Sequence, residues 1–559
     1  MAKDKFALGI DFGTESGRVV VVRLRDGEEM AAAVIPYPDG VLDDKLPGGP
    51  DLAPDWALQN PHDYSLVLEK CVPKALKDAK IRAEDVIGIG TDFTSCTVLA
   101  TKRDGTPLCF LPEYRKKPHA WVKLWKHHAA QREANRINEV GRERNEEFIR
   151  IYGGKYSPEW FFSKVLQVLN EAPEIYDATD KFIEGADWIV WQLTGEEKRN
   201  TSTAGYKAMW VKGKGFPSQE FFRALHPRLE NVIEEKVGTT FYALGARAGG
   251  LTAYWAGKTG LPEGTSVSVG VADGHVAIPA TTVTQPGSLA MVMGTSLVHM
   301  LLGTTRQMVE GICGVVEDGI VPGFWGYEAG QYAGGDIFAW FFDHGVPETI
   351  RREARKLKIP FTAALERRAA ALRPGESGLL ALDWWNGNRS ILVDADLTGI
   401  LLGATLATRP EEIYRALIEA TAFGTRQIIE AFEAKGLASK NLVACGGLPE
   451  KNHLLMQIYA DVTGREIKLA KRLQTCSALG AAMHGAVAAG RAGGGYDSIF
   501  AAAEHMAHLQ KPTYRPRPEA HETYNRVFKE YQTLHDYFGR GGNDVMKRLK
   551  GLKRELVVQ

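Results

Sequence analysis

Two runs of apolar, β-branched residues separated by a turn of small residues lie near the start of the chain. KFALGI leads into and RVVVVRL leads out of the segment GIDFGTESGR, residues 9–18, which is typical of two strands joined by a hairpin. The same pattern returns at residues 287–300, GSLAMVMGTSLVHM, where Gly294-Thr295-Ser296 forms the turn. Two similar hairpins about half a chain apart predict a duplicated architecture, with one hairpin in each of two lobes.

Elsewhere the hydrophobic period alternates between that of a helix and that of a strand. VIGIGTDF at residues 86–93 predicts a buried strand, and residues 476–490 predict a helix whose small residues suit close packing on a sheet. Residues from about 170 to 255 show no clear period and are predicted to be irregular. The pattern indicates an α/β protein, with further helical segments predicted over 62–79, 116–170, 410–434 and 514–559, the last of these a solvated, charged cap.

The composition fits a large enzyme with two major domains. The chain has 559 residues, beyond the size at which one hydrophobic core keeps growing, and we expect a division into residues 1–264 and 265–559. Its 68 basic and 68 acidic residues cancel, so no nucleic-acid partner is indicated. No signal-peptide pattern or long uninterrupted apolar segment is found, which predicts a cytoplasmic protein without a membrane partner. The six cysteines show no CxxC spacing and are expected to be reduced thiols.

The turn of the first hairpin suits an anion. Gly13 adds little bulk, and backbone N–H groups together with the hydroxyls of Thr14 and Ser16 can surround a phosphate. Asp11, at the end of the preceding strand, could hold a magnesium ion that a nucleotide would bring. The spacing matches neither the P-loop nor the dinucleotide-binding GxGxxG motif. An ordinary β-turn in a core sheet is the alternative interpretation, which the second hairpin makes less favoured.

Two further segments carry candidate chemistry. CGGLPEKN, residues 445–452, has glycines that permit close approach of the backbone to a flat ligand such as adenosine. Asp273, in VSVGVADGHVAIPA, follows a Val- and Gly-rich strand and could accept the proton of a sugar hydroxyl as that oxygen attacks the γ-phosphorus of a nucleotide. The alternative is that Asp273 is the N-cap of a helix beginning at His275. The two flanking hairpins favour the role of general base.

The two hairpins and the CGGLPEKN turn, in this order, are similar to the actin-like ATPase superfamily. The chain further resembles the FGGY family of carbohydrate kinases, through DFGTESGR, GVADGHVA, MGTS, the stretch at 394–423 and CGGLPEKN. Essentially the whole chain is covered. The resemblance implies an α/β, two-lobed actin-like ATPase (ribonuclease H-like) fold with a catalytic cleft between the lobes. GTDFTSCTVL, TSTAGYKAMW and WGYEAGQYAGGDIFAWF, which begin at residues 90, 201 and 325, resemble the branch of the family that phosphorylates L-ribulose.

The resemblance also implies roles for individual residues. Asp273 is expected to be the general base, and it is counted among the sugar-binding residues. Lys207 and Glu328 are expected to bind the sugar, and the alternative interpretation is that they form an exposed or interdomain ion pair. Asp92 is also expected to bind the sugar, and the alternative is that it anchors its own loop. The other implied roles are binding of the sugar by Asp92, Ser95, Cys96, Lys207 and Glu328, binding of Mg²⁺ by Asp11, and binding of ATP by Asp11, Gly13, Thr14, Gly294, Thr295, Gly446, Gly447 and Asn452.

The activity implied by the resemblance is the ATP- and Mg²⁺-dependent phosphorylation of L-ribulose to L-ribulose 5-phosphate, a step in arabinose breakdown. Ribitol, D-ribulose or another pentose or polyol is the alternative substrate. A nucleotide-dependent chaperone or cytoskeletal relative would lack the GVADGHVA segment and carry a peptide-binding extension, and retention of Asp11 and Asp273 disfavours an inactive sugar sensor. The sugar and ATP are the expected ligands, and a homodimer is the oligomer common in the family.

Overall fold

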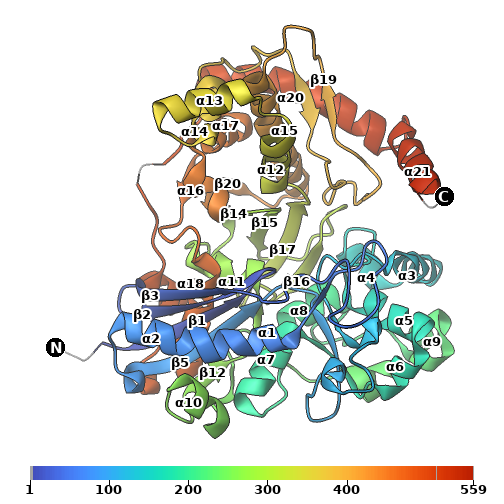
Figure 1. Ribbon diagram of the computed structural model, residues 1–559, viewed down its shortest axis with the longest axis vertical. Coiled ribbons are helices and arrows are strands. Elements are labelled where there is room, and N and C mark those ends of the chain that lie inside the picture. Colours follow the sequence, from blue (N-terminus) through green and yellow to red (C-terminus); the bar gives the residue numbers. More distant parts are fainter. Residues whose placement is uncertain (1–3, 512, 558–559) are drawn as a thin grey trace.

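The computed structural model describes residues 4–511 and 513–557, which form two lobes, each built around a mixed β-sheet (Figure 1). The first sheet has the strand order β11-β12-β5-β1-β2-β3, with β13 also paired to β5. Its strands are β1 (Phe6–Phe12), β2 (Ser16–Arg23), β3 (Glu28–Pro36), β5 (Val86–Phe93), β11 (Arg247–Gly250), β12 (Ser266–Ser268) and β13 (Val271–Ala272).

The second sheet has the order β16-β17-β15-β14-β20-β21. Its strands are β14 (Gly287–Met293), β15 (Leu297–Gly303), β16 (Gly314–Glu317), β17 (Trp325–Gln331), β20 (Ser439–Cys445) and β21 (Ile467–Leu469). In both sheets the first strand of the hairpin pairs antiparallel with the second and parallel with a later strand: β1 with β2 and β5, and β14 with β15 and β20. Both predicted hairpins and the duplicated architecture are therefore confirmed.

The predicted long helices are present as α15 (Pro410–Glu433) and α18 (Cys476–Ala489). The predicted helix over 62–79 is divided into α1 (Pro61–Leu66), a π-helical turn (Val67–Cys71) and α2 (Val72–Ala79). Pro73 lies at the start of α2, where its missing N–H group and its ring disturb regular α-helical hydrogen bonding. The wider turn just before Pro73 lets the helix continue in a shifted register.

The prediction of an irregular region from about 170 to 255 is wrong. This part of the chain contains α6 (Pro173–Ala178), α7 (Gly185–Thr194), α8 (Thr201–Lys207), α9 (Gln219–Leu225) and α10 (Ala253–Thr259). Most of them lie with α3 (Gln131–Glu143), α4 (Glu147–Ile151) and α5 (Phe161–Glu171) in a helical subdomain beside the first sheet (Figure 1). A small sheet belongs to it, made of β4 (Leu58–Gln59), β7 (Val122–Lys123), β6 (Val98–Thr101) and β8 (Lys181–Glu184).

The C-terminal tail is helical as predicted, but only part of it is a solvated cap. It consists of α20 (Pro518–Gly539) and α21 (Val545–Val557). Tyr524, Phe528 and Tyr531 of α20 are buried in the core of the second lobe, so α20 is a structural helix. The other helices of this lobe are α12 (Gly335–His344), α13 (Glu348–Leu357), α14 (Phe361–Ala370), α16 (Gly447–Lys451), α17 (His453–Thr463) and α19 (Ile499–Met506), and β18 (Leu380–Leu382) pairs with β19 (Ile400–Leu402).

Helix α18 lies on the first sheet, although it comes from the last part of the chain (Figure 1). Glycines make this contact close, because a Cβ atom on Gly9 or Gly90 would collide with the backbone carbonyl of Ala478 or Ala481. On its other side α18 touches α11 (Asp273–Ala280), where a Cβ on Gly480 would collide with the carbonyl oxygen of Val276. Helices α11 and α18 therefore form a packed layer against the first sheet.

The proposed division of the chain into domains between residues 264 and 265 stays a prediction. Strands β12 and β13, which follow residue 264, pair with β5 in the first sheet. Within residues 4–511 and 513–557, no helix is both long enough and apolar enough to cross a membrane.

The close contact between α18 and β5 predicts the effect of adding one methyl group. Gly90→Ala should lower the free energy of unfolding by about 3 kcal/mol, because backbone atoms on both sides must separate to admit the Cβ atom. Gly257→Ala in α10 is the control: nothing lies within 4 Å of that position, and alanine should stabilise the helix by about 0.5–1 kcal/mol. Urea unfolding checks both values, and equal midpoints for the two variants would contradict the packing described here.

Candidate active site

Three carboxylates lie at the ends of neighbouring strands of the first sheet. Asp11 is aligned with Asp92 in the parallel β1–β5 pair, and β13, which pairs with β5 at Asp92, leads directly into Asp273. The carboxyl ends of parallel strands meet at one edge of a sheet, which explains why residues so far apart in the sequence come together. This edge of the first sheet is the candidate active site.

Asp273 is the first residue of α11, and its Oδ1 accepts a hydrogen bond from the Gly274 N–H at 2.7 Å. The N-cap position belongs to Ala272, so the alternative of Asp273 as N-cap of a helix starting at His275 is wrong. Burial, together with the nearby carboxylates of Asp11 and Glu328, raises the pKa of Asp273 to about 7. A carboxylate with that pKa can both hold and release a proton near neutral pH.

Asp92 is fully buried, and neither of its carboxylate oxygens has a hydrogen-bond partner of acceptable geometry among the described residues. Its side chain therefore does not anchor the loop that follows it. Burial and the neighbouring charges of Asp11 and Asp273 raise the pKa of Asp92 well above its usual range. Asp11 is half-buried, with its Oδ2 atom 3.5 Å from the guanidinium of Arg18.

The donor set at this edge fits a magnesium ion that arrives with a nucleotide. Mg²⁺ is usually held by one or two carboxylates, with water and substrate phosphates completing its shell. Asp11 and Asp92 supply adjacent carboxylates, and the oxygens of Asp92 lack other partners in the described structure. Among the described residues, no group of three or more His, Cys, Asp or Glu side chains could enclose a metal ion. The two adjacent carboxylates therefore fit a magnesium ion whose other ligands are phosphate oxygens and water.

Each of the two predicted phosphate turns has a hydrogen bond from its glycine N–H to a serine carbonyl of the same turn, three residues on in the first turn and two residues on in the second. In the first turn the Gly13 N–H donates to the Ser16 carbonyl at 3.0 Å, and in the second the Gly294 N–H donates to the Ser296 carbonyl at 3.0 Å. The side chain of Thr14 is also held in place, because its Oγ1 atom accepts from the indole Nε1 of Trp125 at 3.0 Å. Gln59 donates to the Thr14 carbonyl at 2.7 Å. Sequence reasoning missed both supporting residues.

Lys207 and Glu328 form a buried ion pair, with the Lys207 Nζ 2.9 and 3.1 Å from the two carboxylate oxygens. Lys207 ends α8 in the helical subdomain and Glu328 lies in β17 of the second lobe, so the pair joins the lobes. The interdomain ion pair that was the alternative interpretation is thus present. Burial alone would raise the pKa of Glu328, but Lys207, His275 and Arg389 hold it well below its usual range.

His275 and Arg389 complete this cluster and were not predicted. The His275 Nε2 lies 3.2 Å from Glu328 Oε2, and its Nδ1 lies 2.9 Å from the Ser202 hydroxyl. Burial lowers the pKa of His275, which favours the neutral ring. Since a carboxylate only accepts, Nε2 must donate to Glu328 while Nδ1 accepts from Ser202. The hydrogen bonds from Ser202 through His275 to Glu328 connect α8, α11 and β17. His275 stands two residues after Asp273.

The Thr94-Ser95-Cys96 loop follows β5. Cys96 is buried and has a left-handed backbone conformation, with φ of 64°. The fully buried ammonium group of Lys164 donates to the carbonyl oxygens of Cys96 and Leu124 and holds the loop in place. Burial lowers the pKa of Lys164 to about 8. Sequence reasoning missed Lys164, because a lysine in a helix is normally expected to face solvent.

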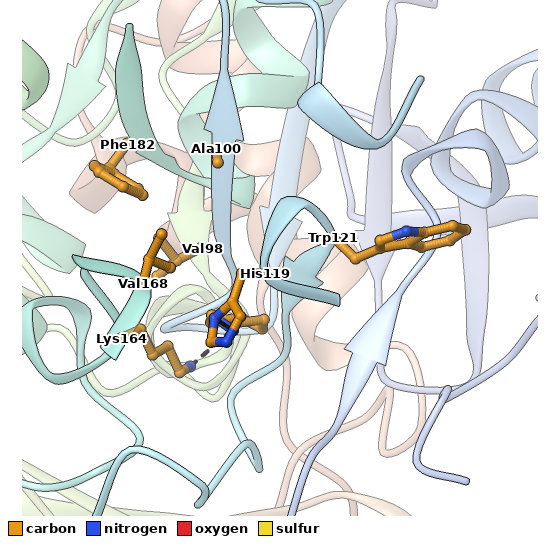
Figure 2. Close-up of a pocket in the computed structure, with 8 residues that line it drawn as sticks. Val98, Ala100, His119, Trp121, Lys164, Val168 and Phe182 are labelled. Atoms are coloured by element: carbon orange, nitrogen blue, oxygen red, sulfur yellow. Dashed lines mark hydrogen bonds between the residues drawn. The ribbon is translucent and has the colours of Figure 1, made fainter. Parts of the chain in front are cut away.

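Lys164 also lines a small cavity of about 10 Å³ (Figure 2). That volume holds about one water molecule and is far too small for a pentose. The cavity is therefore a gap in the packing and not the sugar site. It is lined by Val98, Ala100, His119, Trp121, Lys123, Lys164, Val168 and Phe182.

The CGGLPEKN turn connects β20 to α16. Gly446 has φ of 102°, and a Cβ atom there would collide with the backbone of Met293 in β14. Gly447 begins α16, and open space surrounds its Cβ position. Asn452 is the N-cap of α17: its side chain accepts from the Leu455 N–H at 2.9 Å and donates to the Tyr414 hydroxyl at 2.8 Å. Asn452 thus holds the turn in place through both ends of its amide.

Residues 6–278 match the N-terminal domain of the FGGY family of carbohydrate kinases, and residues 289–489 match the C-terminal domain of the same family. The chain belongs to the FGGY family of carbohydrate kinases. The family resemblance predicted from the motifs is thereby confirmed.

Individual relatives of this kinase cover nearly its full length. It is 58% identical over 550 residues to a ribulokinase from Halalkalibacterium halodurans, covering 98% of both chains. It is 57% identical over 550 residues to a ribulokinase from Geobacillus thermodenitrificans, covering 98% of this chain and 97% of the relative. The solved structure of xylulose kinase from Rhodospirillum rubrum is similar with a TM-score of 0.75 at 22% identity, covering 95% of this chain and 98% of that one. The predicted fold class is confirmed by this likeness.

Proposed function

We propose that this FGGY kinase transfers the γ-phosphoryl group of ATP to the O5 hydroxyl of L-ribulose and forms L-ribulose 5-phosphate. The observation that carries the proposal is the placement of Asp273, with its raised pKa, beside the buried Lys207–Glu328 pair. Similarity to ribulokinases over 98% of the chain supports L-ribulose as the sugar. Ribitol, D-ribulose or another pentose or polyol is the alternative substrate.

Phosphoryl transfer depends on positioning and on neutralising charge, more than on covalent chemistry by the protein. In the proposed assignment, the turn at Gly13 and Thr14 and the turn at Gly294 and Thr295 offer backbone N–H groups to the phosphates. Asp11, with Asp92 beside it, would hold Mg²⁺, which neutralises phosphate charge when bound. Each lobe supplies one turn, so both contact a single nucleotide only when the lobes close around it.

Asp273 is the proposed general base. As the O5 oxygen of the sugar attacks the γ-phosphorus, the O5–P bond forms and the bond from that phosphorus to the leaving ADP oxygen breaks. The proton of the hydroxyl passes to a carboxylate oxygen of Asp273. The Gly274 N–H, which donates to Oδ1, orients the carboxylate for this transfer.

The remaining sites complete the proposal. Ser95, Cys96 and Lys207 are proposed to contact the sugar. Asp92 and Glu328 are proposed to belong to the same sugar site. Gly446 and Gly447 are proposed to lie against adenosine, in a turn that Asn452 caps. The sugar and ATP are the proposed ligands, and we propose a cytoplasmic homodimer. The six buried, unpaired cysteines fit a reducing compartment.

A coupled ADP-release assay with L-ribulose, D-ribulose and ribitol tests the proposed substrate. The kcat/KM value should be highest for L-ribulose, because the stretches around Ser95, Lys207 and Glu328 resemble those of enzymes that act on it. Enzyme without sugar is the control for uncoupled ATP hydrolysis. Absence of sugar-dependent ADP release with all three compounds would contradict the proposal.

Removal of the proposed base should affect turnover far more than binding. Asp273→Ala should lower kcat by about 10²- to 10⁴-fold, the usual contribution of general acid–base catalysis. Calorimetry should show that the sugar and ATP still bind the variant. Asp43→Ala, which removes an exposed carboxylate, is the matched control and should leave kcat unchanged. Near-normal turnover of Asp273→Ala would exclude this residue as the base.

The raised pKa of Asp273 predicts the pH profile. Only the ionised carboxylate can accept the proton, so kcat/KM for the sugar should rise with pH and level off above the pKa of about 7. Initial rates at saturating ATP, measured from about pH 5.5 to 8.5, check the position of this inflection. A flat profile through neutrality would contradict the predicted pKa.

A further inference from the structure

Glu328 accepts hydrogen bonds from three side chains at once. Its Oε1 atom accepts from the Lys207 Nζ at 3.1 Å and from a terminal nitrogen of Arg389 at 3.0 Å. Its Oε2 atom accepts from the Lys207 Nζ at 2.9 Å and from the His275 Nε2 at 3.2 Å. A carboxylate has about four lone-pair sites. Glu328 therefore has no acceptor site left for a sugar hydroxyl.

The same cluster has unused donors, most of them on Arg389. A guanidinium group has five N–H donors, and among the described residues the one hydrogen-bond acceptor of Arg389 is Glu328. The side chain of Arg389 is 15% exposed, compared with 3% for Lys207 and 5% for Glu328. Arg389 is thus the member of the cluster that reaches the accessible side.

Arg389 lies between the lobes. It belongs to the second lobe, and its guanidinium lies 5.8 Å from the ring centre of Tyr332. Glu159, from the helical subdomain of the first lobe, is near enough for its charge to act on Arg389. The Lys207 Nζ and a terminal nitrogen of Arg389 both donate to the Oε1 atom of Glu328, so these two cationic groups are direct neighbours.

We propose that Arg389 is a specificity-determining residue which, with Lys207, recognises the carbonyl oxygen of a ketose. A carbonyl oxygen only accepts hydrogen bonds, which matches a surface of donors. A polyol has a hydroxyl group at that carbon, and its proton needs an acceptor that the saturated Glu328 cannot supply. An unsatisfied buried donor is costly, so the site should discriminate against the polyol. This inference rests on the sugar site of the proposed function.

The comparison of L-ribulose with ribitol tests the proposal, since ribitol has a hydroxyl where L-ribulose has its carbonyl. Wild-type enzyme should have the higher kcat/KM for L-ribulose. Arg389→Met keeps the apolar stem but removes every N–H donor, and it should lower kcat/KM for L-ribulose about 10- to 100-fold. For ribitol the loss should be less than about threefold, because the lone pair freed on Glu328 can accept from the hydroxyl. The KM for ATP should not change.

Two further variants make the result decisive. Arg389→Lys retains one charged donor and should give an intermediate ratio of the two kcat/KM values. Arg373→Met removes an arginine that is 86% exposed and should leave the ratio at its wild-type value. If Arg389→Met does not fold, as judged by its thermal unfolding, the ratio for Arg389→Lys decides: a lowered ratio supports the proposal and an unchanged one overturns it.

Equal losses for the two sugars in Arg389→Met, which leave the ratio of the two kcat/KM values unchanged, would indicate a merely structural role and would overturn the inference. This result leaves the proposed function intact, because the wild-type enzyme would still phosphorylate L-ribulose. Failure of the wild-type enzyme to release ADP with any of the sugars would instead contradict the proposed function, and the inference with it.

Discussion

The packing of α18 on glycines is the constraint on which the rest of the structure depends. Gly9 and Gly90 let the helix lie directly on β1 and β5, and Gly480 lets α11 approach the helix on its other side. An ordinary side chain at any of these three positions would push two backbones apart, in an interior that tolerates little change of volume. The first residue of α11 is Asp273. The position of the proposed base therefore depends on three residues that have no side chain.

The second determinant is electrostatic. Asp11, Asp92 and Asp273 lie at one edge of the first sheet, and burial raises the pKa of each of them. Neighbouring carboxylates raise the pKa values of Asp92 and Asp273 further. The charge of Glu328 acts on Asp273, and Lys207, His275 and Arg389 surround Glu328 and hold its pKa well below its usual range. The site thus has one part that favours bound cations and protons, and another that is rich in N–H donors. An arrangement with a magnesium-bound nucleotide on one side and an oxygen-rich sugar on the other satisfies both parts.

Much of the fold could be predicted from the sequence, because its strongest signals are local. The hairpins show alternating strand patterns around glycine turns, and the helices at 410–434 and 476–490 show long, regular periods. Helix α8 gave no such signal: its sequence, TSTAGYK, is poor in helix-forming residues, and it is stabilised by the Asn200 N-cap and by complete burial. Tertiary contacts of this kind leave no periodic trace in the sequence.

The site could be predicted only in part, for the same reason. Asp11, Asp273, Lys207 and Glu328 lie in motifs that can be recognised in the sequence. Arg389, Lys164 and Trp125 act through contacts between segments that are distant in the chain, so no spacing could reveal them.

The internal repeat separates two parts of the proposed chemistry. The repeated pairing of strands provides a glycine turn in each half, the proposed phosphate site, and in each turn the glycine N–H donates to a serine carbonyl. The helices of the helical subdomain, including those that supply Lys207 and Lys164, come from the chain between β6 and β11 and interrupt that repeat. A turn made of backbone atoms can bind phosphate whatever the other substrate is. Side chains from elements outside the repeat can change without disturbing it. In the proposed assignment, both phosphate turns belong to the repeat, whereas Lys207, a proposed sugar contact, comes from an element outside it.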